Sequence, residues 1–326
     1  MLYPLKFKPI LFPKIWGGNR IKKLYPESAA LENVGESWEI SAVDGHFSEV
    51  ANGFLAENTL DELVEVYLGD LVGDKIFDLF GGQFPLLVKI IDTAQNLSIQ
   101  VHPNDEIAME RHDSLGKTEM WYVLDADDDA FVIAGFNQKI TEKEYLKAVE
   151  NSTLEEKLKK IPVKKGDVIF IPAGCVHSIG KGCLILEIQQ SSDITYRIYD
   201  YNRIDSNGLQ RKLHTELAVD AIDFDNWENN KIIPKILPDT LTELIDCENF
   251  TTNILELSVN KKFELSLSKI DSFVLLSVVE GEIFCEYQGG EIKVKTAETI
   301  LIPAEMDSIT LIAKDKAKIL ATYIGS

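Results

Sequence analysis

The stretch Leu97-Ser-Ile-Gln-Val-His102 decides how this chain is interpreted, because apolar and polar residues alternate along it. Such alternation predicts a β-strand with two different faces. Side chains two positions apart in a strand project to the same face, so Gln100 and His102 are expected to lie together. Glu119 opens a second strand-like stretch of aromatic and β-branched residues, and His177 follows a third.

These four polar residues are candidates for one metal site. Two imidazoles, one carboxylate and an amide oxygen on neighbouring strands are a reasonable ligand set for a divalent metal. Three strong ligands would leave a coordination position open for a substrate. A structural, hydrogen-bonded role is the commoner explanation for a lone histidine, but two histidines together with Glu119 favour a metal.

Size and charge limit the kind of partner. With 326 residues, the chain is long enough to bury a large core, and two domains are expected. The formal net charge of −20 and the pI near 4.7 argue against nucleic acid or an anionic membrane as a partner. An anionic substrate therefore needs a local cluster of Lys and Arg.

The cysteines and the apolar stretches predict a cytoplasmic protein. The four cysteines form no CxxC pair, so free thiols in a reducing compartment are expected. The first residues contain no apolar run of signal-peptide length. The longest apolar stretch, around 273–279, is too short to cross a bilayer.

Three capping boxes predict helices in a chain that otherwise consists of short β-rich runs. They are Thr59 to Glu62, Thr141 to Glu144 and Thr153 to Glu156, and they place helices near 59–70 and 141–161. Gly, Pro, Asn and Asp separate the remaining runs, which is typical of a sandwich or barrel. We therefore expect a mainly β fold with a few helices packed on its N-terminal part.

An internal similarity predicts two related β-barrels. The segment 167–173 (DVIFIPA) resembles the segment 298–304 (ETILIPA), and each follows a β-rich region. In this alignment Ser308 takes the position of His177, so only the first barrel is expected to hold metal ligands. The expected domains are residues 1–235 and 240–326, with the acidic stretch 220–239 as the linker region.

Longer motifs carry a resemblance to a known family. The pattern Gly166-x5-Pro172-x-Gly174-x2-His177 matches the second cupin motif. The long gap between His102 and Glu119, whose residues 103–116 are expected to form a loop, fits a general cupin poorly. The chain resembles the short bacterial form of the type I phosphomannose isomerases. The segments that carry this resemblance are 12–18 (FPKIWGG), 35–41 (GESWEIS), 84–91 (FPLLVKII), 97–105 (LSIQVHPND), 116–121 (GKTEMW) and 196–203 (YRIYDYNR).

The resemblance implies an enzyme with two cupin-like, jelly-roll barrels. Such an isomerase interconverts mannose 6-phosphate and fructose 6-phosphate through an enediol or enediolate. It implies one Zn²⁺ per chain, bound by His102, Glu119, His177 and Gln100. Because an amide oxygen is a weak zinc ligand, Gln100 has an alternative role as a hydrogen-bonding neighbour of the ligands.

The resemblance also implies catalytic and substrate-binding residues. Arg197, Lys117 and Lys89 are the expected catalytic residues, and Trp16 and Ser98 are expected to line the sugar pocket. The arginine, the lysines and the tryptophan each have a structural alternative. The arginine could form a salt bridge to a nearby carboxylate, the lysines could be a solvated or snorkelling strand end, and the tryptophan could be a core aromatic.

Two other functions stay open at this point. Two histidines and a carboxylate also form the facial triad of non-haem Fe(II) oxygenases, which differ in redox-dependent activity and oxygen consumption. A sugar-binding cupin without catalysis is the second alternative, and the complete set of ligand positions with Arg197 argues against it. For the isomerase, the expected partner is a small sugar phosphate, and the protein is expected to be a monomer or homodimer.

Overall fold

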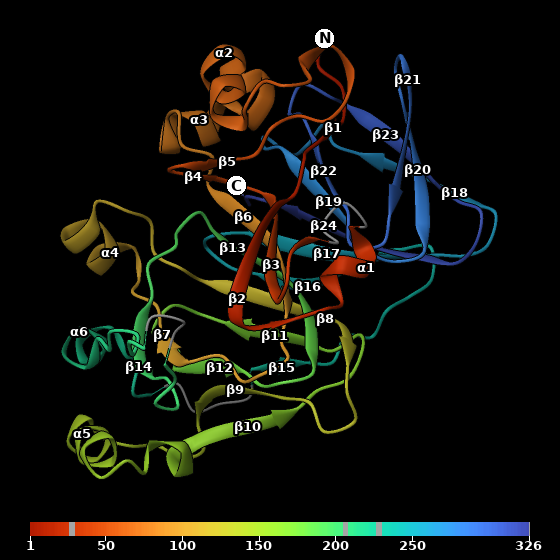
Figure 1. Cartoon of the computed structure of the whole chain (residues 1–326). Coiled ribbons are helices and arrows are strands. Elements are labelled where there is room, and N and C mark those ends of the chain that lie inside the picture. The colour runs from red at the N-terminus through yellow and green to blue at the C-terminus, as the bar shows by residue number, and fades with distance from the viewer. Residues whose placement is uncertain (26–29, 205–207, 226–229, 326) are drawn as a thin grey trace. The chain divides into compact units, whose positions relative to one another are not determined.

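The computed structural model describes residues 1–25, 30–204, 208–225 and 230–325, and its fold is mainly β (Figure 1). Contacts divide the chain into two compact units. One contains Met1–Ile10, Trp38–Lys89 and Ile233–Ser326, and the other contains Leu11–Ser37 and Ile90–Ile232. The domain ranges expected from the sequence, 1–235 and 240–326, stay a prediction.

Two sheets, built mostly from strands between residues 86 and 199, form what we call the N-terminal sandwich. Its first sheet has the order β15 (Lys231–Ile232), β11 (Val168–Ile171), β8 (Glu119–Ala126), β13 (Cys183–Gln190), β6 (Leu86–Asp92), β3 (Val34–Ile40) and β2 (Ile10–Gly18). Its second sheet has the order β10 (Leu158–Pro162), β9 (Phe131–Phe136), β12 (His177–Ile179), β7 (Ile99–Val101) and β14 (Tyr196–Tyr199).

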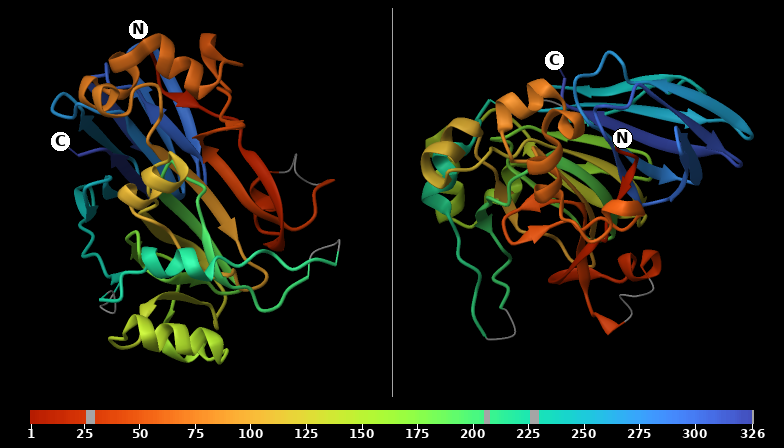
Figure 2. Two further views of the ribbon diagram at one scale, coloured as in Figure 1. Left: turned by 90° about the vertical axis from the view of Figure 1, so that its left-hand side faces the viewer. Right: turned by 90° about the horizontal axis from the view of Figure 1, so that it is seen from above.

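Alternation along β7 explains which side chains face the interior of this sandwich. Ile99 and Val101 pack in a cluster with Tyr145 and Ala218, from helices α5 (Glu142–Glu150) and α6 (Thr215–Ala221). These two helices lie beside the second sheet in Figure 2. Because neighbouring strand residues point to opposite faces, Gln100 points into the sandwich.

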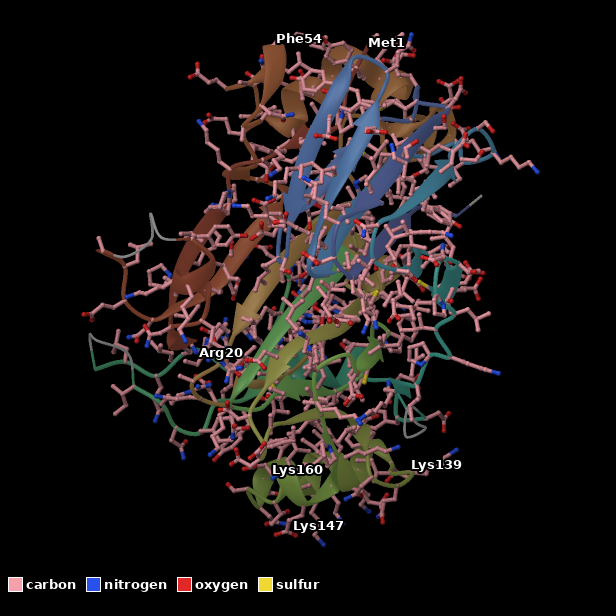
Figure 3. The ribbon with its side chains drawn as sticks, turned by 90° about the vertical axis from the view of Figure 1, so that its right-hand side faces the viewer. Met1, Arg20, Phe54, Lys139, Lys147 and Lys160 are labelled. Atoms are coloured by element: carbon pink, nitrogen blue, oxygen red, sulfur yellow. The ribbon has the colours of Figure 1, made fainter. Side chains whose placement is uncertain are left out.

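The sequence of helix α5 explains why it packs against the second sheet. Thr141 is its N-cap and forms the predicted capping box with Glu144. Tyr145 and Ala148 are buried, whereas Lys147 is exposed and points away from the ribbon in Figure 3. An apolar stripe on one face and charges on the other is what a helix on a sheet surface requires.

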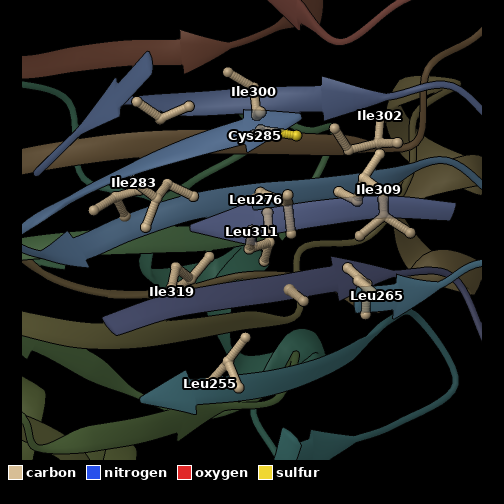
Figure 4. Packing of buried hydrophobic residues seen from close by; sticks show 14 of the residues in the cluster. Leu255, Leu265, Leu276, Ile283, Cys285, Ile300, Ile302, Ile309, Leu311 and Ile319 are labelled. Atoms are coloured by element: carbon tan, nitrogen blue, oxygen red, sulfur yellow. The ribbon is translucent and has the colours of Figure 1, made fainter. Parts of the chain in front are cut away.

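Two further sheets, built mostly from strands between residues 241 and 323, form what we call the C-terminal sandwich. Its first sheet has the order β1 (Leu5–Lys6), β22 (Thr299–Ile302), β19 (Val274–Glu280), β24 (Ala317–Tyr323), β17 (Thr251–Leu257) and β16 (Leu241–Asp246). Its second sheet has the order β18 (Lys261–Ser266), β23 (Ser308–Ala313), β20 (Glu282–Tyr287) and β21 (Gly290–Lys295). Its interior is apolar, with Leu265, Leu276, Ile309 and Leu311 directed into one cluster (Figure 4).

The two sandwiches share one strand topology. In the N-terminal sandwich β13 lies between β6 and β8, and β12 lies between β7 and β9. In the C-terminal sandwich β24 likewise lies between β17 and β19, and β23 lies between β18 and β20. The predicted mainly β architecture with two cupin-like halves is confirmed. Each half consists of two antiparallel sheets, and within the described ranges these sheets do not close into a continuous barrel.

Several local predictions need correction. Residues 154–157 form a short 3-10 helix, η3 (Leu154–Lys157), and 158–162 pair as β10 with β9, so no α-helix continues to 161. The β-branched Ile161 favours a strand, and Pro162 disfavours a continuing helix and is tolerated in β10 because that strand lies at the edge of its sheet. The stretch between His102 and Glu119, expected as a loop, contains helix α4 (Asp105–His112), with Asn104 as its N-cap.

The remaining helices and short elements complete the chain. They are α1 (Ile21–Leu24), the pair β4 (Ala42–Val43) and β5 (His46–Phe47), η2 (Gly53–Leu55), α2 (Leu60–Val72) and α3 (Asp74–Phe80). Contrary to expectation, α2 bonds to the C-terminal sandwich, because Ala304 donates to the Leu71 carbonyl at 3.0 Å. The stretch 220–239, expected to be a linker, contains the end of α6 and β15, which pairs with β11. No helix in the described ranges is both long and apolar enough to span a membrane.

Candidate metal centre

Three strand ends bring His102, Glu119 and His177 together inside the N-terminal sandwich. His102 follows β7, whereas Glu119 and His177 are the first residues of β8 and β12. His102 Nε2 lies 3.2 Å from Glu119 Oε1, and His177 Nε2 lies 3.8 Å from Glu119 Oε2. One ligand atom from each residue lies within 4.8 Å of the other two, and all three side chains are buried. The structure therefore contains a possible metal-binding triad.

Both histidines are oriented by backbone carbonyls. His102 Nδ1 lies 2.7 Å from the carbonyl oxygen of Ile194, and His177 Nδ1 lies 2.8 Å from that of Cys175. A carbonyl only accepts, so each Nδ1 carries the proton and each Nε2 presents a lone pair to the centre. This arrangement is the usual support for a histidine that binds a metal.

Burial and neighbouring charges keep the triad in the protonation state that a metal needs. Burial, and next the Lys117 ammonium, lower the pKa of His102 to about 3. Burial also lowers the pKa of His177. For Glu119, burial acts to raise the pKa, but Lys117 and His102 together hold it well below its usual value. The triad is thus two neutral imidazoles and one carboxylate.

The residues present fit a divalent metal. Both carboxylate oxygens of Glu119 are buried, and neither accepts a hydrogen bond of good geometry from the described residues. The Lys117 ammonium, 2.8 Å from Oε1, offsets part of the cost of burying this carboxylate, and a cation held by the carboxylate and the two Nε2 atoms would offset the rest. Nitrogen and oxygen donors of this kind suit Zn²⁺, although the same set also binds other divalent metals.

Gln100 lies beside the triad, as the sequence predicts. It pairs directly with His177 across β7 and β12, and its Nε2 lies 3.3 Å from His177 Nε2 and 3.5 Å from His102 Nε2. Its Oε1 accepts a hydrogen bond from Ser98 Oγ at 3.3 Å. Rotating the amide by half a turn would point the oxygen at the triad, and the Ser98 hydroxyl, which both donates and accepts, could still bond to it.

Lys117 is the charged neighbour of the triad. Its Nζ lies 2.8 Å from Glu119 Oε1 and 3.2 Å from His102 Nε2. Burial acts to lower its pKa, but Glu119 and Glu187 outweigh burial and raise it. The side chain is therefore a buried ammonium at neutral pH, not a solvated strand end.

Arg197 lies on the same face as the triad, one strand further along. It pairs with Gln100 across β14 and β7, and directly opposed residues of antiparallel strands project to the same side. Its Nη1 donates to the Lys212 carbonyl at 3.1 Å, and its buried Nε has no hydrogen-bond partner among the described residues. Its guanidinium can therefore still bind an oxygen atom.

Lys89 and Trp16 have clear local surroundings. Lys89, in β6, is buried, and its Nζ lies 5.0 Å from the centre of the Trp38 ring. Trp16 is buried in the apolar interior of the N-terminal sandwich with Trp121 and Ile171. This cluster gives Trp16 a packing role, and the pocket roles of Trp16 and Ser98 and the catalytic role of Lys89 stay predictions.

Sequence reasoning missed Glu187. This residue of β13 is buried and accepts a hydrogen bond from Trp121 Nε1 at 2.9 Å. Its charge helps to raise the pKa of Lys117. The signal was a lone carboxylate in the apolar run Cys183-Leu-Ile-Leu-Glu-Ile, because a charge there is rarely buried without a partner.

Comparisons with known proteins agree with this site. The model of the type I phosphomannose isomerase catalytic domain matches residues 5–139, and that of the mannose-6-phosphate isomerase cupin domain matches residues 240–323. Mannose-6-phosphate isomerase ManA of Bacillus subtilis is 40% identical over 285 residues, which are 86% of each chain. This chain belongs to the type I phosphomannose isomerase family.

Other known proteins are similar to this chain in sequence, in fold or in both. A mannose-6-phosphate isomerase of Streptococcus mutans is 42% identical over 226 residues, which cover 68% of each chain. A crystal structure of the mannose 6-phosphate isomerase from Bacillus subtilis superposes with a TM-score of 0.88 at 32% identity, covering 99% of this chain and 100% of that one. A putative mannosephosphate isomerase from Archaeoglobus fulgidus has the same fold, with a TM-score of 0.80 at 22% identity.

Proposed function

We propose that this chain is a metal-dependent aldose–ketose isomerase that interconverts mannose 6-phosphate and fructose 6-phosphate. The observation that carries the proposal is the buried triad of His102, Glu119 and His177 in a member of the type I phosphomannose isomerase family. Zn²⁺ is the proposed metal, one ion per chain, with Gln100 as a fourth ligand through its amide oxygen.

The reaction needs groups that make a weak carbon acid ionise. A proton leaves C2 and returns at C1 while the carbonyl moves from C1 to C2, and negative charge develops on the sugar oxygens on the way. When bound, the metal supplies a Lewis acid that polarises the sugar carbonyl. The protein must supply the remaining hydrogen-bond donors and a proton carrier.

Lys117 and Arg197 are the residues that we assign to those tasks. The Lys117 ammonium, 2.8 Å from Glu119, can donate a hydrogen bond or a proton to an oxygen that becomes negative near the triad. Arg197 shares a face with Gln100, and its planar guanidinium suits the binding of two neighbouring oxygens. The base that removes the C2 proton is one of Lys89, Lys117 and water, and Lys117 would have to lose its own proton first.

The charges near Arg197 support an anionic substrate. Arg203 and Arg211 both bind the buried carboxylate of Asp200, with Arg211 Nε 2.7 Å from Oδ2. Among the described residues, the charges that act on Arg197 are two further arginines and one carboxylate, which leaves a local excess of positive charge in a chain whose formal net charge is −20. Such a local excess is what a sugar phosphate requires of an acidic protein.

A coupled assay for fructose 6-phosphate formation from mannose 6-phosphate tests the proposal. Purified protein is assayed as prepared, after chelation, and after zinc is added back. We expect activity that disappears with the chelator and returns with zinc. Folded, zinc-loaded protein that forms no fructose 6-phosphate would contradict the proposal, and oxygen consumption with Fe(II) would instead indicate an oxygenase.

A further inference from the structure

The residues on either side of Lys117 are held by a short chain of hydrogen bonds that ends at Asp105. Oδ1 of Asp105 accepts from the backbone N–H of Gly116 at 2.7 Å and from Nε2 of Gln190 at 2.8 Å. The amide oxygen of Gln190 accepts from the backbone N–H of Thr118 at 2.9 Å. The N–H groups before and after Lys117 are therefore both bound by side chains.

This chain of bonds has only one possible direction. Gln190 is 5% exposed, so both ends of its amide must find partners inside the protein. The N–H of Thr118 only donates and the Asp105 carboxylate only accepts. The Gln190 amide is consequently fixed in one orientation, with oxygen toward Thr118 and nitrogen toward Asp105.

Lys117 needs such support because it lies outside the regular ladder. Strand β8 begins at Glu119, and the segment before it has two long backbone hydrogen bonds, from Lys117 N–H to the Pro103 carbonyl and from Gln190 N–H to the Thr118 carbonyl, both 3.2 Å, in place of a continuous ladder. The segment is also tightly packed, because a Cβ on Gly116 would lie 2.6 Å from the nitrogen of Asp105. A displacement of about 1 Å in a reacting group can cost roughly 100-fold in rate.

We propose that Gln190 and Asp105 are positioning residues, which hold the Lys117 ammonium at the triad. The catalytic consequence rests on the isomerase function proposed above. Gln190 is the central member, because it is buried and bonds to both neighbours. Asp105 is exposed at its outer side and fixes the Gln190 amide from there.

Four variants test this arrangement in the zinc-loaded enzyme. In Gln190→Ala and Asp105→Ala we expect kcat to fall roughly 10- to 100-fold, with KM within about 3-fold of the wild-type value. Asp105→Asn should recover most of kcat, because an asparagine oxygen accepts both bonds. Glu106→Ala, which removes the neighbouring exposed carboxylate of α4, is the matched control and should leave kcat unchanged.

Bound zinc separates positioning from loss of the triad. We expect the ratio of zinc to protein in Gln190→Ala and Asp105→Ala to equal that of the wild type. Wild-type kcat in both alanine variants would overturn the proposal. A loss of zinc that parallels the loss of activity would overturn it too, because Gln190 would then support the triad and not Lys117.

Acylation of lysines gives a readout that does not depend on activity. Lys117 is buried, so a water-soluble amine-reactive ester should modify it slowly in the wild type and several-fold faster in Gln190→Ala, as followed by peptide mass spectrometry. Lys89, equally buried, is the internal control and should not change. Unchanged Lys117 labelling would overturn the positioning role. If the wild type itself lacks isomerase activity, the proposed function fails, and labelling still decides the positioning role.

Discussion

The two sandwiches follow the same strand order but have opposite interiors. In the N-terminal sandwich, Gln100, His102, Glu119 and His177 gather at one end of the interior. The C-terminal sandwich fills the corresponding positions with apolar side chains. One chain path thus supports either a reactive centre or a plain core, and the choice depends on a few inward-facing residues.

Strand register identifies the corresponding positions. Glu119 pairs with Ile171, the last residue of β11, and Val274 pairs with Ile302, the last residue of β22. Val274 therefore replaces Glu119. On the second sheets, His177 pairs with Gln100, and Ile309 pairs with Leu265. Among inward-facing residues, Ile309 and Leu265 replace His177 and Gln100.

The expected correspondence between Ser308 and His177 needs correction. Each residue begins its strand, as the sequence alignment implied. However, Ser308 is exposed, whereas Ile309 is 2% exposed and packs in the interior (Figure 4). A shift of one residue turns a strand side chain to the other face, and an alignment of short apolar runs does not detect such a shift.

The turn before each of these strands has also changed partners. In the N-terminal sandwich, Gly174 donates to the His102 carbonyl at 2.9 Å, so the turn holds segments that carry ligands. In the C-terminal sandwich, the backbone N–H of the matching residue, Glu305, donates to the Asp70 carbonyl of α2 at 2.9 Å. The same turn organises a metal site in one sandwich and anchors a helix in the other.

The largest expected effect is on catalysis, when His177 is replaced by isoleucine, the residue at the matching inward position of the C-terminal sandwich. In His177→Ile we expect kcat/KM to fall by roughly 1,000-fold or more, about 4 kcal/mol, because one metal ligand is lost. Metal analysis should show the matching loss of zinc. The conservative change Ile309→Val in the other sandwich is the control, and wild-type activity in His177→Ile would refute the triad as the metal site.

Removal of the Lys117 ammonium should separate catalysis from metal binding. In zinc-loaded Lys117→Met we expect kcat to fall roughly 100- to 1,000-fold, about 3–4 kcal/mol, because a proton carrier next to the triad is absent. Zinc should stay bound, since none of the proposed ligands has changed. Lys181→Met, at an exposed lysine paired with Asp129, serves as the control. Unaltered kcat would show that Lys117 is structural.

A third pair of variants tests the register of the C-terminal sandwich. Ile309→His should destabilise the protein by about 2–4 kcal/mol, because it places a polar ring in an apolar interior. Ser308→His, at the adjacent exposed position, should change stability by less than about 0.5 kcal/mol. Denaturant midpoints measure both effects. If the serine variant were the more damaging one, the assignment of inward positions would be wrong.

Several features of this site were predictable from sequence because the underlying rules are local. The i, i+2 spacing of Gln100 and His102 gave a shared face, and the motif context of Glu119 and His177 led to the same centre. The helix at 105–112 was missed although Asn104 is a good N-cap, because a Pro-Asn-Asp sequence equally suggests a loop. The roles of Glu187 and Gln190 depend on pairing between distant strands, which no local pattern encodes.

The smallest expected effect is on stability, and it is the most informative about the comparison of the two sandwiches. It needs a combined variant. Changing Gln100 and His102 to Leu, Lys117 to Met, Glu119 to Val, His177 to Ile and Glu187, the other carboxylate near Lys117, to Gln would remove the buried charges of this centre and make it resemble the counterpart. Replacing buried charges with apolar residues of similar size is often neutral or stabilising by about 1–4 kcal/mol. We therefore expect the variant to be inactive but at least as stable as the metal-free wild type.

That stability comparison must use metal-free protein, because bound zinc stabilises the wild type by mass action. Denaturant midpoints of the chelated wild type and the combined variant provide the measurement. A variant less stable by more than about 2 kcal/mol would mean that the polar residues help to hold the sandwich together, as a damaged core does. Equal or greater stability would mean that the fold tolerates the triad and that the triad is retained for its chemistry.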